Sequence, residues 1–190
     1  MRYKKTEINE DQNRWHLFCS IYNNLYKKTS KNILNIEAVL NNLEESNLLN
    51  ETVIYAYVLV IKLLIDPNDD NNYYLLKKLL EEKSFFVATN ELEVLYTHLR
   101  NYCILQKINL GQTAFFDELF EIFKVQLSKN LLLKNQQLNT QNYKNIITVS
   151  LRVKAFDWLE KFIKEYTPKL PENEQSNALN YNLANVYFYQ

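Results

Sequence analysis

Apolar residues recur three and four positions apart along most of the chain, which is the spacing of one face of an α-helix. From Trp15 to Tyr26 they fall at steps of 0, 3, 4, 7, 10 and 11 residues, and the same steps recur from Leu92 to Cys103. No stretch alternates apolar and polar residues over a useful length, as a half-buried β-strand would. The pattern therefore predicts an all-α protein.

Turn-forming residues divide this pattern into separate helices. The clearest loop is 66–71, where Pro67 follows an aspartate and capping residues precede an apolar run. The only glycine, Gly111, falls where a helix is expected to end, and Asn139 opens another helix. These breaks predict nine helices, over 9–28, 31–46, 51–65, 71–86, 90–110, 113–134, 140–153, 155–166 and 173–190.

The second helix of each successive pair carries the same apolar pattern. Four such helices align without internal gaps at offsets of 40, 43 and 40 residues, and 18 of the 20 aligned positions are apolar. The aligned residues are Ile33, Ile36, Val39, Leu40 and Leu43; Tyr73, Leu76, Leu79, Leu80 and Lys83; Phe116, Leu119, Ile122, Phe123 and Gln126; and Phe156, Leu159, Phe162, Ile163 and Tyr166. A near-constant spacing of this length is typical of arrays of helical hairpins.

The last segment carries Leu183 and Ala184, followed three residues later by Tyr187, and Pro168 precedes it at the end of a helix. In these residues it resembles the first helix of a tetratricopeptide repeat, which carries Leu-Gly/Ala and then Tyr, and the family's inter-repeat proline. For 1–154 the similarity is architectural only, because the spacing there exceeds the family's repeat of about 34 residues. The resemblance implies an all-α fold of antiparallel helical hairpins stacked into a right-handed α-solenoid, whose first helices line a concave groove.

We expect residues 1–190 to form a single helical-repeat domain of about nine helices that stops half-way through its last unit. A first helix without its partner leaves an apolar face uncovered, whereas solenoid ends normally carry a polar cap. Three explanations remain open. The chain is a piece of a longer array, its last helix acts as the cap, or 173–190 pairs with another chain.

Composition and charge exclude several classes of site. One glycine in 190 residues excludes phosphate-cradling loops, dinucleotide fingerprints, nucleophile elbows and tight hairpin turns. Lys+Arg and Asp+Glu both number 22, and this zero net charge disfavours a nucleic-acid partner. The longest apolar run, 53–65, is too short to span a bilayer, and no signal peptide is visible. We therefore expect a cytoplasmic protein with no nucleic-acid or membrane partner.

Residues that support acid–base or metal chemistry are few and scattered. His16 and Cys19 share a helix face, but His98 and Cys103 lie five residues apart, on directions that diverge by roughly 140°. No His-Glu-x-x-His or Cys-x-x-Cys element is present, and the acidic residues of 117–121 fit a helix start. We therefore expect no catalytic residue, no metal and no cofactor. The alternative is a helical regulatory or enzymatic domain whose site is assembled from scattered residues.

Aromatic residues make up 14% of the chain, more than a small helical core requires. Tyr and Trp are enriched at interfaces because the ring supplies area and the polar tip a hydrogen bond. The residues expected to line the groove are Tyr181, Asn185, Phe188 and Tyr189 on the last helix and Ser150 and Lys154 on the preceding unit. Packing between helices is the other interpretation of these tyrosines. We predict a non-enzymatic scaffold or adaptor that binds a protein or peptide in this groove, and self-association through 173–190 is a further possibility.

Overall fold

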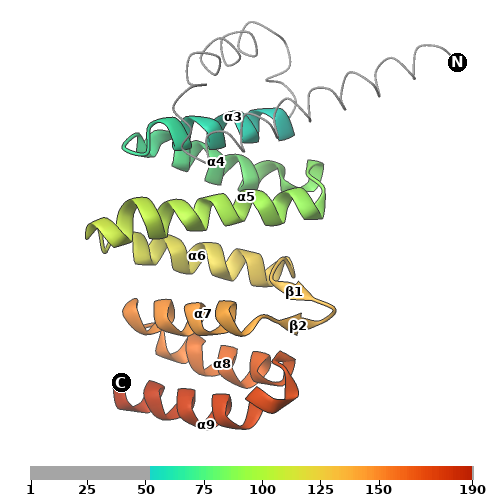
Figure 1. Cartoon of the computed structure of the whole chain (residues 1–190), viewed down its shortest axis with the longest axis vertical. Helices are drawn as coiled ribbons and strands as arrows, with labels where there is room; N and C mark the ends of the chain where they lie inside the picture. Colours follow the sequence, from blue (N-terminus) through green and yellow to red (C-terminus); the bar gives the residue numbers. More distant parts are fainter. Residues whose placement is uncertain (1–51, 190) are drawn as a thin grey trace, which may run out of the picture. The chain divides into compact units, whose positions relative to one another are not determined.

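The computed structural model describes residues 52–189, which form seven α-helices packed in antiparallel order (Figure 1). The helices are α3 (Thr52–Ile65), α4 (Asp70–Lys83), α5 (Thr89–Asn101), α6 (Phe115–Ser128), α7 (Thr140–Arg152), α8 (Phe156–Tyr166) and α9 (Glu172–Tyr189). The helices predicted over 9–28 and 31–46 lie outside the described residues. The all-α prediction is confirmed for the described part, apart from one short hairpin. The chain forms two compact units, Met1–Val87 and Ala88–Gln190. The prediction of one continuous repeat domain stays a prediction.

In the first unit, α3 and α4 pack against each other as a helical hairpin. The loop between them is where the sequence places it. Asp69 caps α4 by accepting a hydrogen bond from the N–H of Asn71 at 3.0 Å. Four of the five aligned residues of α4 are buried, and Lys83, the last, is exposed. The aligned pattern therefore marks the buried face of this helix.

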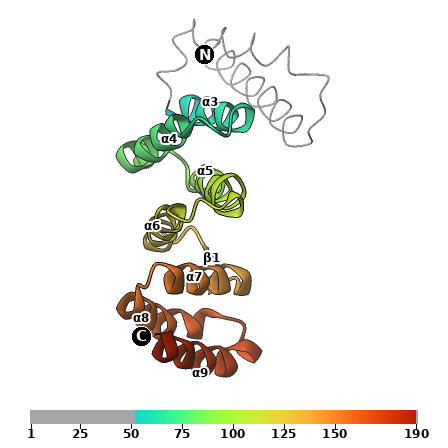
Figure 2. The same cartoon turned by 90° about the vertical axis from the view of Figure 1, so that its left-hand side faces the viewer.

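In the second unit, each helix from α5 to α9 packs on the next along the chain (Figure 2). The predicted apolar pattern is again the buried face, with Leu119, Ile122 and Phe123 buried on α6. On α8 the corresponding residues are also buried. Gln126, the one polar residue in the aligned pattern of α6, is as buried as its apolar neighbours. At this position of the aligned pattern burial therefore varies, since Gln126 is buried on α6 and Lys83 is exposed on α4.

Aromatic rings join α6, α7 and α8. The ring of Phe162 stacks on Trp158, Tyr166 and Tyr143, with centroid distances of 5.4, 4.9 and 5.4 Å. Phe120 meets Trp158 edge to face, with centroids 4.9 Å apart. Tyr143 therefore serves packing between α7 and α8, whereas Tyr166 contacts Phe162 within α8.

The helix predicted over 90–110 changes type along its length. After α5 the chain continues as a π-helical segment, Tyr102–Lys107, and a 3₁₀ turn, Ile108–Leu110. Lys107 is buried, with its ammonium 5.2 Å from the ring centroid of Tyr102 and 5.5 Å from that of Phe115. The helical path was predicted correctly, but the spacing of apolar residues did not reveal the change of helix type.

The helix predicted over 113–134 ends early, at the end of α6, and a two-stranded antiparallel hairpin follows it. Its strands are β1 (Leu133–Lys134) and β2 (Gln137–Leu138). The turn residues Asn135 and Gln136 both lie in the left-handed region, with φ of 51° and 64°. Such a turn favours Asn and Gly. The expectation that a single glycine excludes tight hairpin turns is therefore wrong, because non-glycine residues occupy both turn positions.

Three left-handed residues end helical segments in the second unit, namely Gly111 (φ 89°), Asn130 (φ 57°) and Lys154 (φ 56°). In each case the N–H of the next residue donates to the carbonyl five positions back, as from Ala155 to Ser150 at 3.0 Å. This is the Schellman motif, in which glycine is the usual left-handed residue. Gly111 matches its predicted place at a helix end, and an asparagine and a lysine fill the same role elsewhere.

Lys154→Gly should raise the free energy of unfolding by about 1 kcal/mol, because glycine adopts the left-handed conformation without steric penalty. Urea denaturation followed by circular dichroism measures the change. Lys129→Gly is the matched control, since Lys129 lies next to a left-handed residue but has a φ of −91°. A variant at Lys154 that is no more stable than the one at Lys129 would contradict this account of the cap.

Candidate functional site

An open groove of about 840 Å³ lies between α7 and α9 in the second unit. Its lining residues are Thr140, Tyr143, Lys144, Ile147, Thr148 and Leu151 on α7, Leu170 before α9, and Asn173, Glu174, Asn177, Ala178, Asn180, Tyr181, Asn182 and Asn185 on α9. One wall is thus rich in asparagine, and the other combines apolar and hydroxyl side chains. The size is that of a typical ligand-binding pocket.

Four groove residues of α9 follow one another at steps of four residues: Asn173, Asn177, Tyr181 and Asn185. We call these four residues the asparagine row. Residues four apart lie on one face of a helix, one above the other. Within the part of the chain that the structure describes, the three asparagine side chains of the row make no hydrogen bond. Their carboxamide donors and acceptors are therefore available to a ligand.

The opposite wall has an apolar floor and little charge. Ile147 is buried at the base of the groove, and Leu151 is half-buried beside it. The groove contains one cation, Lys144, and one anion, Glu174. An occupant therefore meets apolar surface and neutral hydrogen-bonding groups, with no net charge from the walls.

Buried hydrogen bonds hold the floor of the groove in place. The hydroxyl of Thr167 donates to the carbonyl of Ile163 at 2.6 Å, so its single hydrogen is used there. The Tyr143 hydroxyl, 2.7 Å away, therefore donates to Thr167. Burial raises the pKa of Tyr143, and hydrogen bonds with Thr167 and Asn182 partly offset this. These hydrogen bonds connect α7, α8 and α9 behind the groove.

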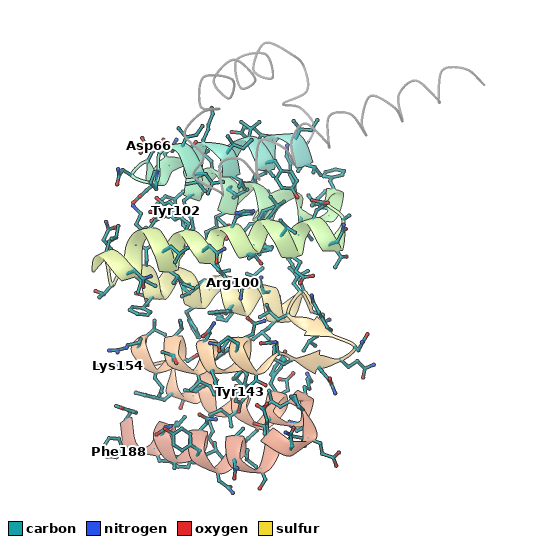
Figure 3. The ribbon with its side chains drawn as sticks, in the orientation of Figure 1. Asp66, Arg100, Tyr102, Tyr143, Lys154 and Phe188 are labelled. Carbon is teal, nitrogen blue, oxygen red and sulfur yellow. The ribbon has the colours of Figure 1, made fainter. Side chains whose placement is uncertain are left out.

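Two of the six predicted site residues, Tyr181 and Asn185, line this groove. The side chain of Tyr181 is 69% exposed, which suits a contact residue. Phe188 and Tyr189 are 81% and 60% exposed, and their rings meet with centroids 5.3 Å apart, but they lie beyond the groove lining (Figure 3). The end of α9 therefore presents a separate aromatic surface.

The two residues predicted on the preceding unit do not line the groove. Ser150 is fully buried, and its hydroxyl donates to the carbonyl of Ile146 at 2.7 Å, so it faces the packed interior. Lys154 is exposed but lies past the end of α7, in the Schellman cap. The groove face of α7 instead carries Lys144 and Thr148. These polar residues between apolar ones were the signal in the sequence that would have given the correct register.

His98 and Cys103 lie on the same helical path but form no site together. His98 is half-buried on α5, and desolvation of its ring lowers its pKa to about 4. Cys103 is fully buried in the π-helical segment. Within residues 52–189, no group of three or more His, Cys, Asp and Glu side chains is arranged to hold a metal ion. His16 and Cys19 lie outside the described residues.

Comparisons with protein families, curated proteins and solved structures found no match to this chain. The similarity to tetratricopeptide repeats therefore rests on the residues named in the sequence analysis alone. No helix between residues 52 and 189 combines the length and the hydrophobicity needed to cross a membrane.

Proposed function

We propose that this chain is a non-enzymatic scaffold that binds an extended segment of a partner protein in the groove between α7 and α9. The observation that carries the proposal is the asparagine row, whose carboxamides face the groove region without partners of their own among the described residues. Asparagine offers both a donor and an acceptor, which is what the backbone of an extended peptide requires.

The spacing of the asparagine row suits such a backbone. Steps of four residues on an α-helix advance about 6 Å, and an extended peptide repeats every two residues, at about 6.6–6.8 Å. The row covers 173–185, or about 18 Å, which corresponds to five or six peptide residues. The carboxamides of Asn173 and Asn177 therefore lie close to the spacing of alternate peptide groups, and that of Asn185 follows after about twice that distance, with Tyr181 between.

The side chains on the walls of the groove indicate which kind of partner segment would fit. Ile147 and Leu151 favour apolar side chains on the face of the peptide that enters the groove. The single pair of opposite charges, Lys144 and Glu174, favours a segment without a strong net charge. Tyr181 supplies the aromatic anchor that commonly dominates the affinity of an interface.

The solenoid architecture is part of the proposal. We infer that α7 and α9 are the first helices of successive hairpins in a right-handed array, as the similarity of 155–190 to tetratricopeptide repeats implies. In that arrangement first helices share one side of the array. A groove lined by α7 and α9 is consistent with this side being the binding surface.

Peptides selected from a random display library against the full chain test the proposal. Tyr181→Ala should weaken binding of the selected peptides about tenfold, which is ~1.4 kcal/mol. Tyr189→Ala is the matched control, because Tyr189 is an exposed tyrosine on the same helix but lies outside the groove. Its dissociation constant should stay within about twofold of the unmodified chain. Equal losses in the two variants, or a loss only at Tyr189, would contradict binding in this groove.

A further inference from the structure

A second cavity, of about 390 Å³, lies in the second unit between α5, the β1–β2 hairpin and the start of α7. One part of its wall is polar and includes Thr97, Arg100 and Asn142. Another part is apolar and includes Leu131, Leu132 and Leu138. The cavity is therefore amphipathic, and its volume is near the lower end of the range for small-molecule pockets.

Arg100 is the principal charged group of this cavity (Figure 3). Its guanidinium lies over the ring of Phe123, 5.4 Å from the centroid. One Nη donates to Oδ1 of Asn142 at 3.2 Å, and the other donates to Oγ1 of Thr97 at 3.3 Å. Both bonds are long, and both acceptors are neutral. Burial lowers the pKa of Arg100 because it desolvates the charge, and the carboxylate of Glu93 offsets this in part.

The guanidinium has donors to spare. An arginine carries five N–H groups, and only two of those of Arg100 are directed at an acceptor in the described part of the chain. Nε is buried and has no hydrogen-bond partner among these residues. A partly buried cation with unused donors favours an anion beside it, because an uncompensated charge in a desolvated site is unfavourable.

The charges of the cavity do not balance. Its lining contains two cations, Arg100 and Lys134, and one carboxylate, Glu93. Glu93 lies 3.6 Å from the ammonium of Lys134 and also interacts electrostatically with Arg100, so one carboxylate is shared between two cations. Arg100 makes no ion pair within residues 52–189. One unit of positive charge is left at the polar wall.

We propose that this cavity binds a small monocarboxylic acid, whose carboxylate pairs with Arg100 and whose hydrocarbon part lies against Leu131, Leu132 and Leu138. A carboxylate carries the single negative charge that the cavity lacks, and its two oxygens match the fork of a guanidinium. The three leucines supply an apolar surface next to it. The lining of this cavity shares only Thr140 with that of the proposed peptide groove.

The full chain is titrated with acetate, propionate and butyrate to test the site. Binding is monitored by the NMR signal of the Arg100 side-chain Nε–H. Ionic strength is held constant with chloride. The signal should shift and saturate, with a Kd on the order of 1 mM for butyrate. Affinity should rise by about fourfold for each added methylene, because each methylene is buried against the leucines. The Nε–H signal of Arg152, an exposed arginine, should not move.

Two further comparisons decide the assignment. Arg100→Lys keeps the charge but loses the fork, and should weaken butyrate at least tenfold, whereas Arg152→Lys should leave its affinity unchanged. Butylamine, which has the same hydrocarbon and the opposite charge, should not bind. The proposal is overturned if the carboxylates shift the Arg100 Nε–H signal no more than chloride does, or if acetate and butyrate bind with equal affinity. Binding of inorganic phosphate in place of the carboxylates would also overturn it. If Arg100→Lys does not fold, the titration of the unmodified chain alone tests the proposal.

Discussion

Lowering the pH from 7 to 4 should reduce the free energy of unfolding by about 3 kcal/mol through one residue, His98. Burial lowers the pKa of His98 to about 4 in the folded chain, compared with 6.5 for an exposed histidine. Between these two values the unfolded chain binds the proton and the folded chain does not. Stability therefore falls as the pH drops below about 6.5, and this contribution levels off below about 4.

Urea denaturation at a series of pH values measures this loss, and His98→Gln is the variant to compare. The variant has no titrating ring at this position, so its stability should fall less steeply between pH 6.5 and 4, whatever its stability at pH 7. Proton NMR of the folded chain gives the second readout, because the ring signals of His98 should titrate near pH 4. A ring that titrates near pH 6.5 would show that burial does not disfavour its charge.

Gln126→Leu should raise the free energy of unfolding by about 2 kcal/mol. The side chain of Gln126 is completely buried on α6, and neither its Oε1 nor its Nε2 has a hydrogen-bond partner within residues 52–189. A buried polar group without partners is unfavourable by about 1–3 kcal/mol relative to an apolar one. Leucine is close to glutamine in volume and favours the helix, so the change removes the polar atoms with little repacking.

Gln141→Leu is the control for this change, because Gln141 is an exposed glutamine on α7 and its replacement should alter stability by less than about 0.5 kcal/mol. Denaturation curves of the two variants are compared under the same conditions. If Gln126→Leu instead lowers stability, the amide of Gln126 is hydrogen-bonded in solution through a buried water, and removing it loses those bonds.

The buried faces of α4, α6 and α8 could be predicted from the sequence because buried positions recur with the period of the helix. On α8, Leu159, Phe162 and Ile163 are apolar at helical spacing and all are buried. The loop before α4 and the cap of α7 were predicted for a similar reason, since Asp69 and Asn139 accept backbone N–H groups that a helix start leaves free. Local chemistry determines these features, so local sequence reveals them.

The features that the sequence did not reveal depend on backbone geometry and on neighbouring helices. The hairpin turn uses Asn135 and Gln136 in conformations more typical of glycine, so composition argued against it. Of the residues predicted on α7 and α9, Tyr181 and Asn185 line the groove, whereas Ser150 is buried in the interior. Which side of α7 meets its neighbours depends on three helices at once, and a pattern within one helix cannot decide it.

The π-helical segment Tyr102–Lys107 bears on the unequal spacing of the aligned apolar patterns. A π turn closes its hydrogen bonds over five residues instead of four, as the bond from Ile108 N–H to the Cys103 carbonyl shows, so it accommodates one residue more than an α turn. The middle of the three repeat offsets, 43 against 40, contains this segment. One residue of this difference in spacing can thus be accommodated inside a helix rather than in a loop. A single-residue insertion absorbed there would have left the flanking apolar faces in register, which is how a repeat can change its length and keep its packing.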